Sequence, residues 1–350
     1  MTKLPIAIFF ICSIFSASSQ DLPRIIILAT GGTIAGQGTS STGAGYVPGK
    51  LSVEELLNNI PAINKVATVR GEQIASVGSY DITVELWLKL ARRINEIFEK
   101  DEADGIVITH GTDTQEETAY FLSLTVKHSK PVVLTGAMRP ATSISADGPK
   151  NLFDAIVAAS DLQSRGRGVL ISFNEKLFDG KTVVKINTTN VEAFASLNTG
   201  PIGKVFDGRV KYYYPAADVR SNSPVFDISR HDSLPRVEIV YMYVGASGTA
   251  VRAFANEGAK GIVIAGSGNG SFNKSILREV ESGIKKGIAV VRASRVSSGT
   301  VTPSNQVFVD EQLGTIAAED HNPQKARILL MLALTKTSNR NTIQEMFLEY

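Results

Sequence analysis

Apolar residues follow two different patterns along this chain. Continuous apolar runs, which are typical of strands buried on both faces of a sheet, occur at 25–29, 106–109, 131–135 and 168–173. Apolar residues spaced three and four apart predict helices at 83–100, 116–125 and 152–160. A further helix is predicted to begin after Ser52, which with Glu55 forms a capping-box pattern. Strands that alternate with helices indicate a mostly parallel sheet covered on both faces.

The alternation is interrupted at 212–235, which is rich in Tyr, Ser and Pro and shows little apolar periodicity. It then resumes, with strands predicted at 237–243, 261–265 and 288–293 and helices at 249–256, 274–285, 324–336 and 341–350. We therefore predict an α/β protein of two domains. A larger, mostly parallel α/β domain at 20–211 is joined by a linker at 212–235 to a smaller Rossmann-like α/β domain at 236–350.

The first 19 residues differ from the rest of the chain. One lysine is followed by an almost wholly apolar run at 4–15 and by four small residues at 16–19. This pattern is typical of a secretory signal peptide, cleaved after Ser18 or Ser19, and the apolar run is too short to anchor the chain in a bilayer. The alternative is a buried first helix. The single cysteine, Cys12, lies in this segment, so the mature chain is expected to lack disulfides and thiol nucleophiles.

Charge and motifs exclude several functional classes. The formal net charge is only +2, and no basic run with interleaved aromatic residues occurs, which argues against nucleic-acid and membrane-surface binding. The glycines at 31–36 do not fit a dinucleotide fingerprint, because Thr33 stands where the second glycine belongs. The histidines are scattered without metal-ligand spacing, so we expect no metal and no cofactor; they are His110, His128, His231 and His321.

Two of the apolar runs end in turns of glycine and threonine. One reads Thr-Gly-Gly-Thr at 30–33, and the other reads Thr-His-Gly-Thr-Asp-Thr at 109–114. Ligands of open α/β sheets bind outside the carboxyl ends of the strands, so we expect two threonines, Thr33 and Thr112, to converge on one pocket. A hydroxyl needs a neighbouring base to act as a nucleophile, and here Tyr, Lys or a carboxylate would supply it. Helix capping is the structural alternative for both threonines.

Residues 29–36 and 108–114 are similar to the two signature segments of bacterial L-asparaginases and glutaminase-asparaginases. The resemblance runs from about Pro23 to Tyr350 and includes the segments 137–140, 145–149, 164–168 and 322–327. Together with the predicted signal peptide, the pattern resembles the exported type II enzymes, which implies a periplasmic or secreted protein. The implied reaction is hydrolysis of L-asparagine to L-aspartate and ammonia through an acyl-enzyme.

The resemblance implies a role for each matched residue. Thr33 matches the primary nucleophile, and Tyr46 matches the tyrosine that helps to activate it and closes over the substrate. Thr112 matches the second catalytic threonine, and Lys185 the lysine paired with it. Asp113 matches the carboxylate that holds the substrate α-amino group and orients this lysine.

The resemblance also implies how the substrate is held and how the chain assembles. Ser79 matches the serine that binds the substrate α-carboxylate. The family forms homotetramers of two intimate dimers with active sites at the dimer interfaces, and Asn269 would reach the site from the neighbouring chain. Neither metal nor cofactor takes part, and the partners are the small-molecule amide and further copies of the chain.

Two positions depart from the family pattern. Tyr80 follows Ser79 where the family usually has Gln or Glu, and Gln306 stands where it usually has a glutamate that reaches the adjacent subunit's site. Asp310 or Glu311 would replace that glutamate if the loop shifts its register. These departures predict weaker amino-acid binding or an altered preference, which leaves a glutaminase-asparaginase open. An amino-acid-binding protein without catalytic activity is the alternative from another class.

Overall fold

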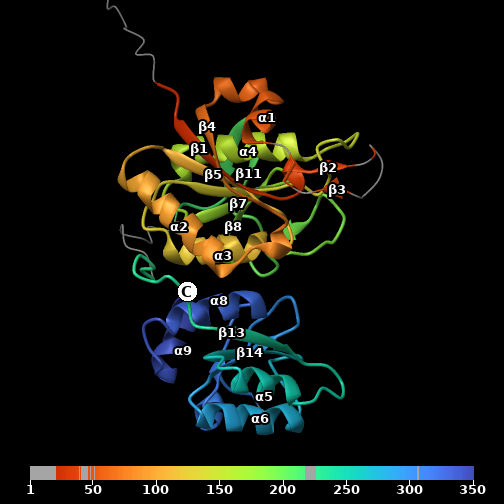
Figure 1. Cartoon of the computed structure of the whole chain (residues 1–350), viewed down its shortest axis with the longest axis vertical. Helices are drawn as coiled ribbons and strands as arrows, with labels where there is room; N and C mark the ends of the chain where they lie inside the picture. Colours follow the sequence, from red (N-terminus) through yellow and green to blue (C-terminus); the bar gives the residue numbers. More distant parts are fainter. Residues whose placement is uncertain are drawn as a thin grey trace, which may run out of the picture.

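The computed structural model describes residues 21–38, 40, 46–47, 49–50, 52–216, 226–305 and 307–350. Two α/β domains lie one above the other along the longest axis of the molecule (Figure 1). The predicted fold class is confirmed: the larger, mostly parallel sheet belongs to the N-terminal domain, and the smaller C-terminal domain is built on a parallel sheet. The predicted signal peptide lies outside the described residues.

In the part of the chain that the structure describes, eight strands form the N-terminal sheet, in the order β12-β11-β8-β7-β6-β5-β1-β4. The strands β4, β1, β5, β6 and β7 run parallel. Strands β8, β11 and β12 extend the sheet by antiparallel pairing. Their bounds are β1 Arg24–Gly31, β4 Thr68–Val77, β5 Gly105–Thr109, β6 Val132–Thr135, β7 Val169–Phe173, β8 Lys176–Asp179, β11 Gly203–Phe206 and β12 Arg209–Tyr212. Because β1 and β5 are adjacent and parallel, their carboxyl ends lie side by side.

Helices cover both faces of this sheet. Helices α2 and α3 pack on one face, and α4 packs on the other against β5, β6 and β7. The predicted capping box at the start of α1 is present, with Ser52 and Glu55 bonded reciprocally. The bounds are α1 Val53–Asn58, α2 Val84–Glu99, α3 Gln115–Thr125 and α4 Gly148–Ser160, with the 3-10 turns η1 Thr33–Ala35, η2 Pro61–Lys65, η3 Ser79–Asp81 and η4 Leu162–Ser164.

Two small sheets complete this domain. They pair β2 Gln37–Gly38 with β3 Tyr46–Val47, and β9 Val184–Lys185 with β10 Phe194–Ala195.

The continuous apolar runs predicted the central parallel strands within one or two residues. They missed β4, β8 and the short strands that follow, because these elements are half-exposed or only two to four residues long.

Among the described residues, the C-terminal sheet has four parallel strands in the order β13-β14-β15-β16. Helices α5 and α6 cover one face, while α8 packs on the other face and on α3 of the N-terminal domain. Apolar side chains of both domains form one continuous buried cluster at this junction. The bounds are β13 Val237–Tyr241, β14 Gly261–Gly266, β15 Ala289–Ser294, β16 Ile316–Ala317, α5 Thr249–Asn256, α6 Lys274–Lys285, α7 Asp310–Leu313, α8 Pro323–Ala333 and α9 Arg340–Glu349.

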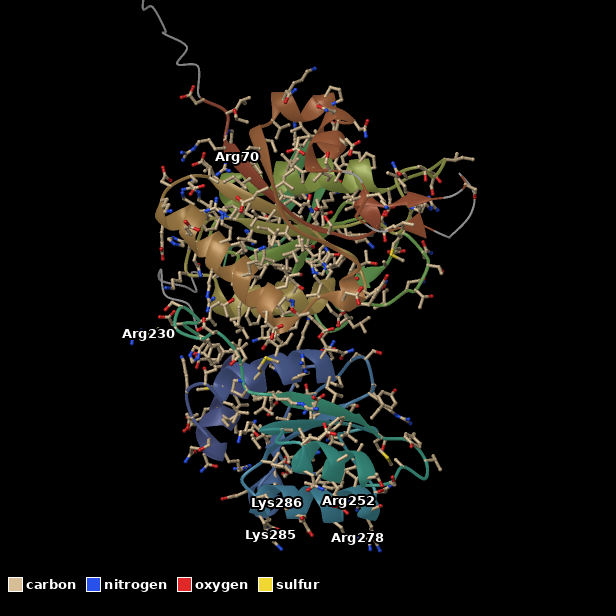
Figure 2. All side chains as sticks on the ribbon, viewed as in Figure 1. Arg70, Arg230, Arg252, Arg278, Lys285 and Lys286 are labelled. Atoms are coloured by element: carbon tan, nitrogen blue, oxygen red, sulfur yellow. The ribbon has the colours of Figure 1, made fainter. Side chains whose placement is uncertain are left out.

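Cationic side chains gather at the outer end of the C-terminal domain, away from this junction. Figure 2 shows Arg252, Arg278, Lys285 and Lys286 there, on and beside α5 and α6. Arg252 forms a surface ion pair with Glu279 at 2.8 Å. Within the described part of the chain, no helix is long and apolar enough to cross a membrane.

Candidate active site

The two glycine–threonine turns meet at the carboxyl ends of β1 and β5. Gly32 has a φ of +82°, and a Cβ atom on it would lie 2.4 Å from the backbone nitrogen of Gly111. Only glycine permits this close approach together with a left-handed backbone. The hydroxyl of Thr30 donates a hydrogen bond to the carbonyl oxygen of Thr109, 2.9 Å away, which ties the first turn to the second strand. The two turns therefore form one continuous surface.

Thr33 begins the 3-10 turn η1 directly after Gly32 and is only 5% exposed. The chain returns past this turn, because the amide of Gly49 donates to the carbonyl of Gly32 and that of Lys50 to the carbonyl of Ala35. Tyr46 lies on β3 in the same returning segment, paired through its backbone with β2. The structure thus places the Tyr46 backbone on the segment that runs beside Thr33, while the Tyr46 side chain lies outside what is described.

Thr112, Asp113 and Lys185 lie together. The Lys185 ammonium donates to the Thr112 hydroxyl at 2.9 Å and to the Asp113 carboxylate at 2.5 Å. The Thr112 hydroxyl in turn donates to the sulfur of Met138, 3.4 Å away. Thr112 is 5% exposed and the Lys185 side chain 15%, whereas the Asp113 side chain is 57% exposed and faces solvent. This arrangement can pass a proton between an amine and a hydroxyl while a carboxylate stabilises the cation.

Ser79 lies on the other side of Asp113. It begins the 3-10 turn η3 after β4 and is 4% exposed, and its hydroxyl accepts a hydrogen bond from the Asp113 amide at 3.2 Å. Its carbonyl accepts one from the Thr114 hydroxyl at 2.7 Å. Tyr80 points outward and is 68% exposed, with its ring against Gly78. The structure therefore joins Ser79, Asp113, Thr112 and Lys185 in one hydrogen-bonded group, with Tyr80 at its edge.

Asn269 lies in the C-terminal domain, in the turn after β14. Its side-chain amide exchanges two hydrogen bonds with Thr302, both of 2.9 Å. Among the proposed loop acids, Asp310 is fully buried in an ion pair with Arg292 and faces the interior of its own domain, whereas Glu311 is exposed. Gln306 lies outside the described residues. The described residues thus place Asn269 in the C-terminal domain, bonded to a neighbour there.

A buried histidine supports the second turn from behind. Burial lowers the pKa of His110 to about 4, so the imidazole is neutral at physiological pH. Its Nδ1 lies 2.7 Å from the carbonyl oxygen of Gly111, which can only accept, so this nitrogen carries the proton. Its Nε2 then accepts from the Thr118 hydroxyl, which itself accepts from the Trp87 indole N–H. This histidine is fully engaged in holding the turn.

Glu116 also belongs to this site, although no sequence motif indicates it. It is 6% exposed, and its carboxylate accepts hydrogen bonds from the backbone amide of Lys185 and from the side-chain amide of Asn322. A carboxylate in the first turn of a helix is expected for electrostatic reasons alone, so its position gave no signal. Asn322 belongs to the segment 322–327, which carried part of the resemblance without a role.

A hollow of about 360 Å³ opens beside this group, and Asp113, Glu117 and Lys185 are among the residues that line it. Burial raises the pKa of Glu117 to about 7. Among the described residues there is no cluster of three or more His, Cys, Asp or Glu side chains that could hold a metal ion.

Family models match both domains. The model "Asparaginase, N-terminal" matches residues 24–218, and the model "Glutaminase/Asparaginase C-terminal domain" matches residues 236–347. The structure is similar to that of a probable cytoplasmic L-asparaginase from Campylobacter jejuni, with a TM-score of 0.89 and 48% sequence identity. That alignment covers 94% of this chain and 100% of the other.

Curated relatives match this chain over nearly their whole length. L-asparaginase 2 of Escherichia coli is 48% identical over 96% of this chain and 96% of its own length. A probable periplasmic L-asparaginase of Haemophilus influenzae is 46% identical over 100% of this chain and 99% of its own. A glutaminase-asparaginase of Pseudomonas fluorescens is 43% identical over 95% of this chain and 92% of its own. The chain therefore belongs to the asparaginase family.

Proposed function

We propose that this protein is an exported L-asparaginase that hydrolyses L-asparagine to L-aspartate and ammonia. The observation that carries the proposal is the Lys185 ammonium, which bridges Thr112 and Asp113 beside the turn that holds Thr33. Family membership gives this group its chemical context, because relatives that match over nearly the whole chain are named L-asparaginases.

The proposed reaction has two steps. In the first, the Thr33 oxygen attacks the amide carbon of the substrate, with Tyr46 helping to remove the hydroxyl proton. The C–N bond breaks, and the nitrogen leaves as ammonia after it receives that proton. In the second, water attacks the resulting ester, the C–O bond to Thr33 breaks, and aspartate leaves. Lys185 and Thr112 relay the proton that the attacking water loses to the leaving Thr33 oxygen, which restores the Thr33 hydroxyl.

Backbone N–H groups of the two turns would stabilise the carbonyl oxygen of the substrate during the reaction. Negative charge develops on the carbonyl oxygen in both steps, and donors fixed before the reaction stabilise it without reorganising. The left-handed glycines at 31 and 32 allow the first turn to aim its backbone toward the crevice. Substrate recognition would fall to Ser79 for the α-carboxylate and Asp113 for the α-ammonium.

Comparable activity on L-glutamine is the second candidate function. The relatives include three glutaminase-asparaginases at 42–43% identity. Tyr80 favours this possibility, because it replaces a residue type that helps to bind the amino end of the substrate, and its exposed phenol changes both charge and bulk at the edge of the site.

We further propose that the chain assembles as a homotetramer and is exported. A homotetramer with active sites between subunits agrees with the exposed apolar side chains near the end of β13, which are Tyr241, Tyr243 and the 96%-exposed Val244. In such an assembly Asn269 would approach the site of a neighbouring subunit. Export to the periplasm or medium rests on the sequence of residues 1–19.

A coupled assay of ammonia release on the purified chain without residues 1–19 tests the activity. We expect ammonia from L-asparagine, and a fall in kcat on the order of 10³-fold or more in Thr33→Val and in Lys185→Met. Binding of L-asparagine by calorimetry without ammonia release would instead identify an amino-acid-binding protein. Full activity of Thr33→Val would disprove the assignment of the nucleophile.

A further inference from the structure

The strand that carries Lys185 is too short to fix its own position. β9 contains only Val184 and Lys185, and it pairs with two residues of β10. Both residues are half-buried. A two-residue pairing gives little stability by itself, because hairpins in water need further packing. Other groups must therefore hold the Lys185 backbone so that its ammonium meets both Thr112 and Asp113.

Buried side chains from two helices form hydrogen bonds with the backbone of this strand and of the residues before it. The Glu116 carboxylate on α3 accepts from the backbone amide of Lys185. The Lys325 ammonium on α8 donates to the carbonyl oxygens of Lys181, at 2.8 Å, and of Val183. Glu116 is 6% exposed and Lys325 is 2% exposed. All three hydrogen bonds go to main-chain atoms, so they fix the path of the chain whatever its side chains are.

Asn322 joins the two helices. Its side-chain oxygen accepts from the backbone amide of Lys325 at 2.9 Å and so caps the N-terminus of α8. Its side-chain nitrogen donates to the second carboxylate oxygen of Glu116 at 3.0 Å. The cap fixes the orientation of the Asn322 amide, because a flip would place a donor against a donor. Glu116 must therefore accept at both oxygens, which only a carboxylate can do.

We propose that Glu116, Asn322 and Lys325 form a clamp that positions Lys185, with Glu116 as its central positioning residue. The clamp gives the segment 322–327 a role: the C-terminal domain supports the proposed active site of its own chain through the backbone of β9. The inference rests on the proposed amidohydrolase function, because its consequence is read in that reaction.

The clamp predicts an effect on turnover rather than on substrate binding. A displacement of about 1 Å at a catalytic group can lower a rate about 10²-fold. The proposed contacts with the substrate come from Ser79, which precedes α2 and lies outside the clamp, and from Asp113, whose backbone amide stays bonded to Ser79 when Lys185 shifts. Loosening the clamp should therefore lower kcat and leave KM largely unchanged.

Glu116→Gln is the first test, because it keeps the shape and removes one acceptor. If the side-chain oxygen of the introduced glutamine still accepts from the Lys185 amide, its NH₂ group opposes the NH₂ group of Asn322. We expect kcat for L-asparagine to fall about 10- to 100-fold, with KM changed by less than about threefold.

Adding Asn322→Asp to Glu116→Gln is the second test, because the pair of side chains then again has one donor facing one acceptor. One oxygen of the introduced aspartate would keep the cap on Lys325, and the other would accept from the NH₂ group of the introduced glutamine. We expect the double variant to regain most of the wild-type kcat. Asn322→Asp alone should lose activity, since it places two carboxylates against each other.

Asp154→Asn serves as the matched control. Asp154 is a 1%-exposed helical carboxylate in the same domain, but it lies on α4 across the sheet from α3 and pairs with Lys150. We expect wild-type kcat in this variant, and thermal unfolding of every variant shows whether it is folded.

The outcomes separate the two proposals. Failure of the double variant to recover kcat, or an unchanged kcat in Glu116→Gln, would overturn the clamp while the wild type remains active. A wild type that releases no ammonia would overturn the proposed function, and the clamp's role in catalysis with it.

Discussion

The two domains use the carboxyl edges of their parallel sheets in different ways. In the N-terminal domain, the turn after β5 leaves the exposed Asp113 beside an open hollow that Lys185 also lines. In the C-terminal domain, the polar groups after β14 and β15 bond to one another. Arg292 is fully buried, pairs with Asp310 and also donates to the carbonyl oxygens of Asn269 and Thr302.

This difference shows how one architecture supports two tasks. Polar groups that stay exposed at a strand end are available to a ligand, whereas groups that are buried against each other fix the shape of a loop. The first edge is therefore suited to chemistry. The second is suited to presenting Asn269 in a defined position, as its proposed contribution to a neighbouring subunit requires.

Arg292→Met should cause the largest change in stability, because it removes the cation that joins the polar groups at the C-terminal sheet edge. The substitution leaves the Asp310 carboxylate buried and without its guanidinium partner. We expect the free energy of unfolding to fall by about 3–5 kcal/mol, which is the usual cost of removing one member of a buried ion pair. Urea titration followed by circular dichroism measures it, with the denaturant midpoint falling and the slope unchanged.

Two further variants sharpen this result. Arg252→Met removes an exposed cation at the outer end of the domain (Figure 2), and we expect a loss below about 1 kcal/mol. Arg292→Met with Asp310→Leu removes both buried charges and should recover part of the lost stability. Equal losses in the buried and exposed single variants would contradict the distinction between the two kinds of pair.

Much of the fold could be predicted from the sequence, because long elements carry strong periodic signals. The run at 106–109 and the amphipathic pattern at 83–100 correspond to β5 and α2. β4 was missed because its side chains are mostly half-exposed and it contains Gly71, so it lacks a continuous apolar run. Short strands such as β9 owe their place to contacts with distant helices, which leave no local pattern.

The site was predictable to the extent that a motif placed its residues. Thr112 and Asp113 share one turn, and the structure brings Lys185 to both. Glu116 could not be found in this way, because it acts on the main chain of a residue 69 positions away. Hydrogen bonds from side chain to backbone impose no spacing between the residues involved, so only the fold shows them.

The two domains are alike in that His110 is buried in the first and His321 in the second. Burial lowers the pKa of His110 and of His321 from 6.5 to about 4. Below pH 6.5 the unfolded chain therefore takes up protons that the folded chain does not, so each histidine lowers stability as the pH falls toward 4. Glu117, whose pKa is raised to about 7, acts in the opposite direction, so the effect is best measured as a difference between variants.

We expect His321→Gln to gain stability relative to the wild type as the pH falls from 6.5 to 4. The relative gain should approach about 1.4 kcal/mol per pH unit, and His110→Gln should show the same trend. Urea titrations of the three proteins at several pH values measure it. A difference from the wild type that does not vary with pH would mean that the buried imidazoles are protonated in the folded state.

The smallest effect on stability and binding is expected in Tyr80→Gln, at the edge of the candidate active site. Tyr80 is 68% exposed, so its replacement should change the free energy of unfolding by less than about 0.5 kcal/mol. A glutamine amide can add one hydrogen bond to the bound amino acid, worth about 0.5–1.5 kcal/mol, which corresponds to a KM about two- to thirteenfold lower. Steady-state kinetics with L-asparagine and L-glutamine measures it, and Tyr214→Gln, at another exposed tyrosine, is the control. If KM and kcat/KM stay the same for both amides, position 80 does not contact the substrate, and the preference between the amides is set elsewhere.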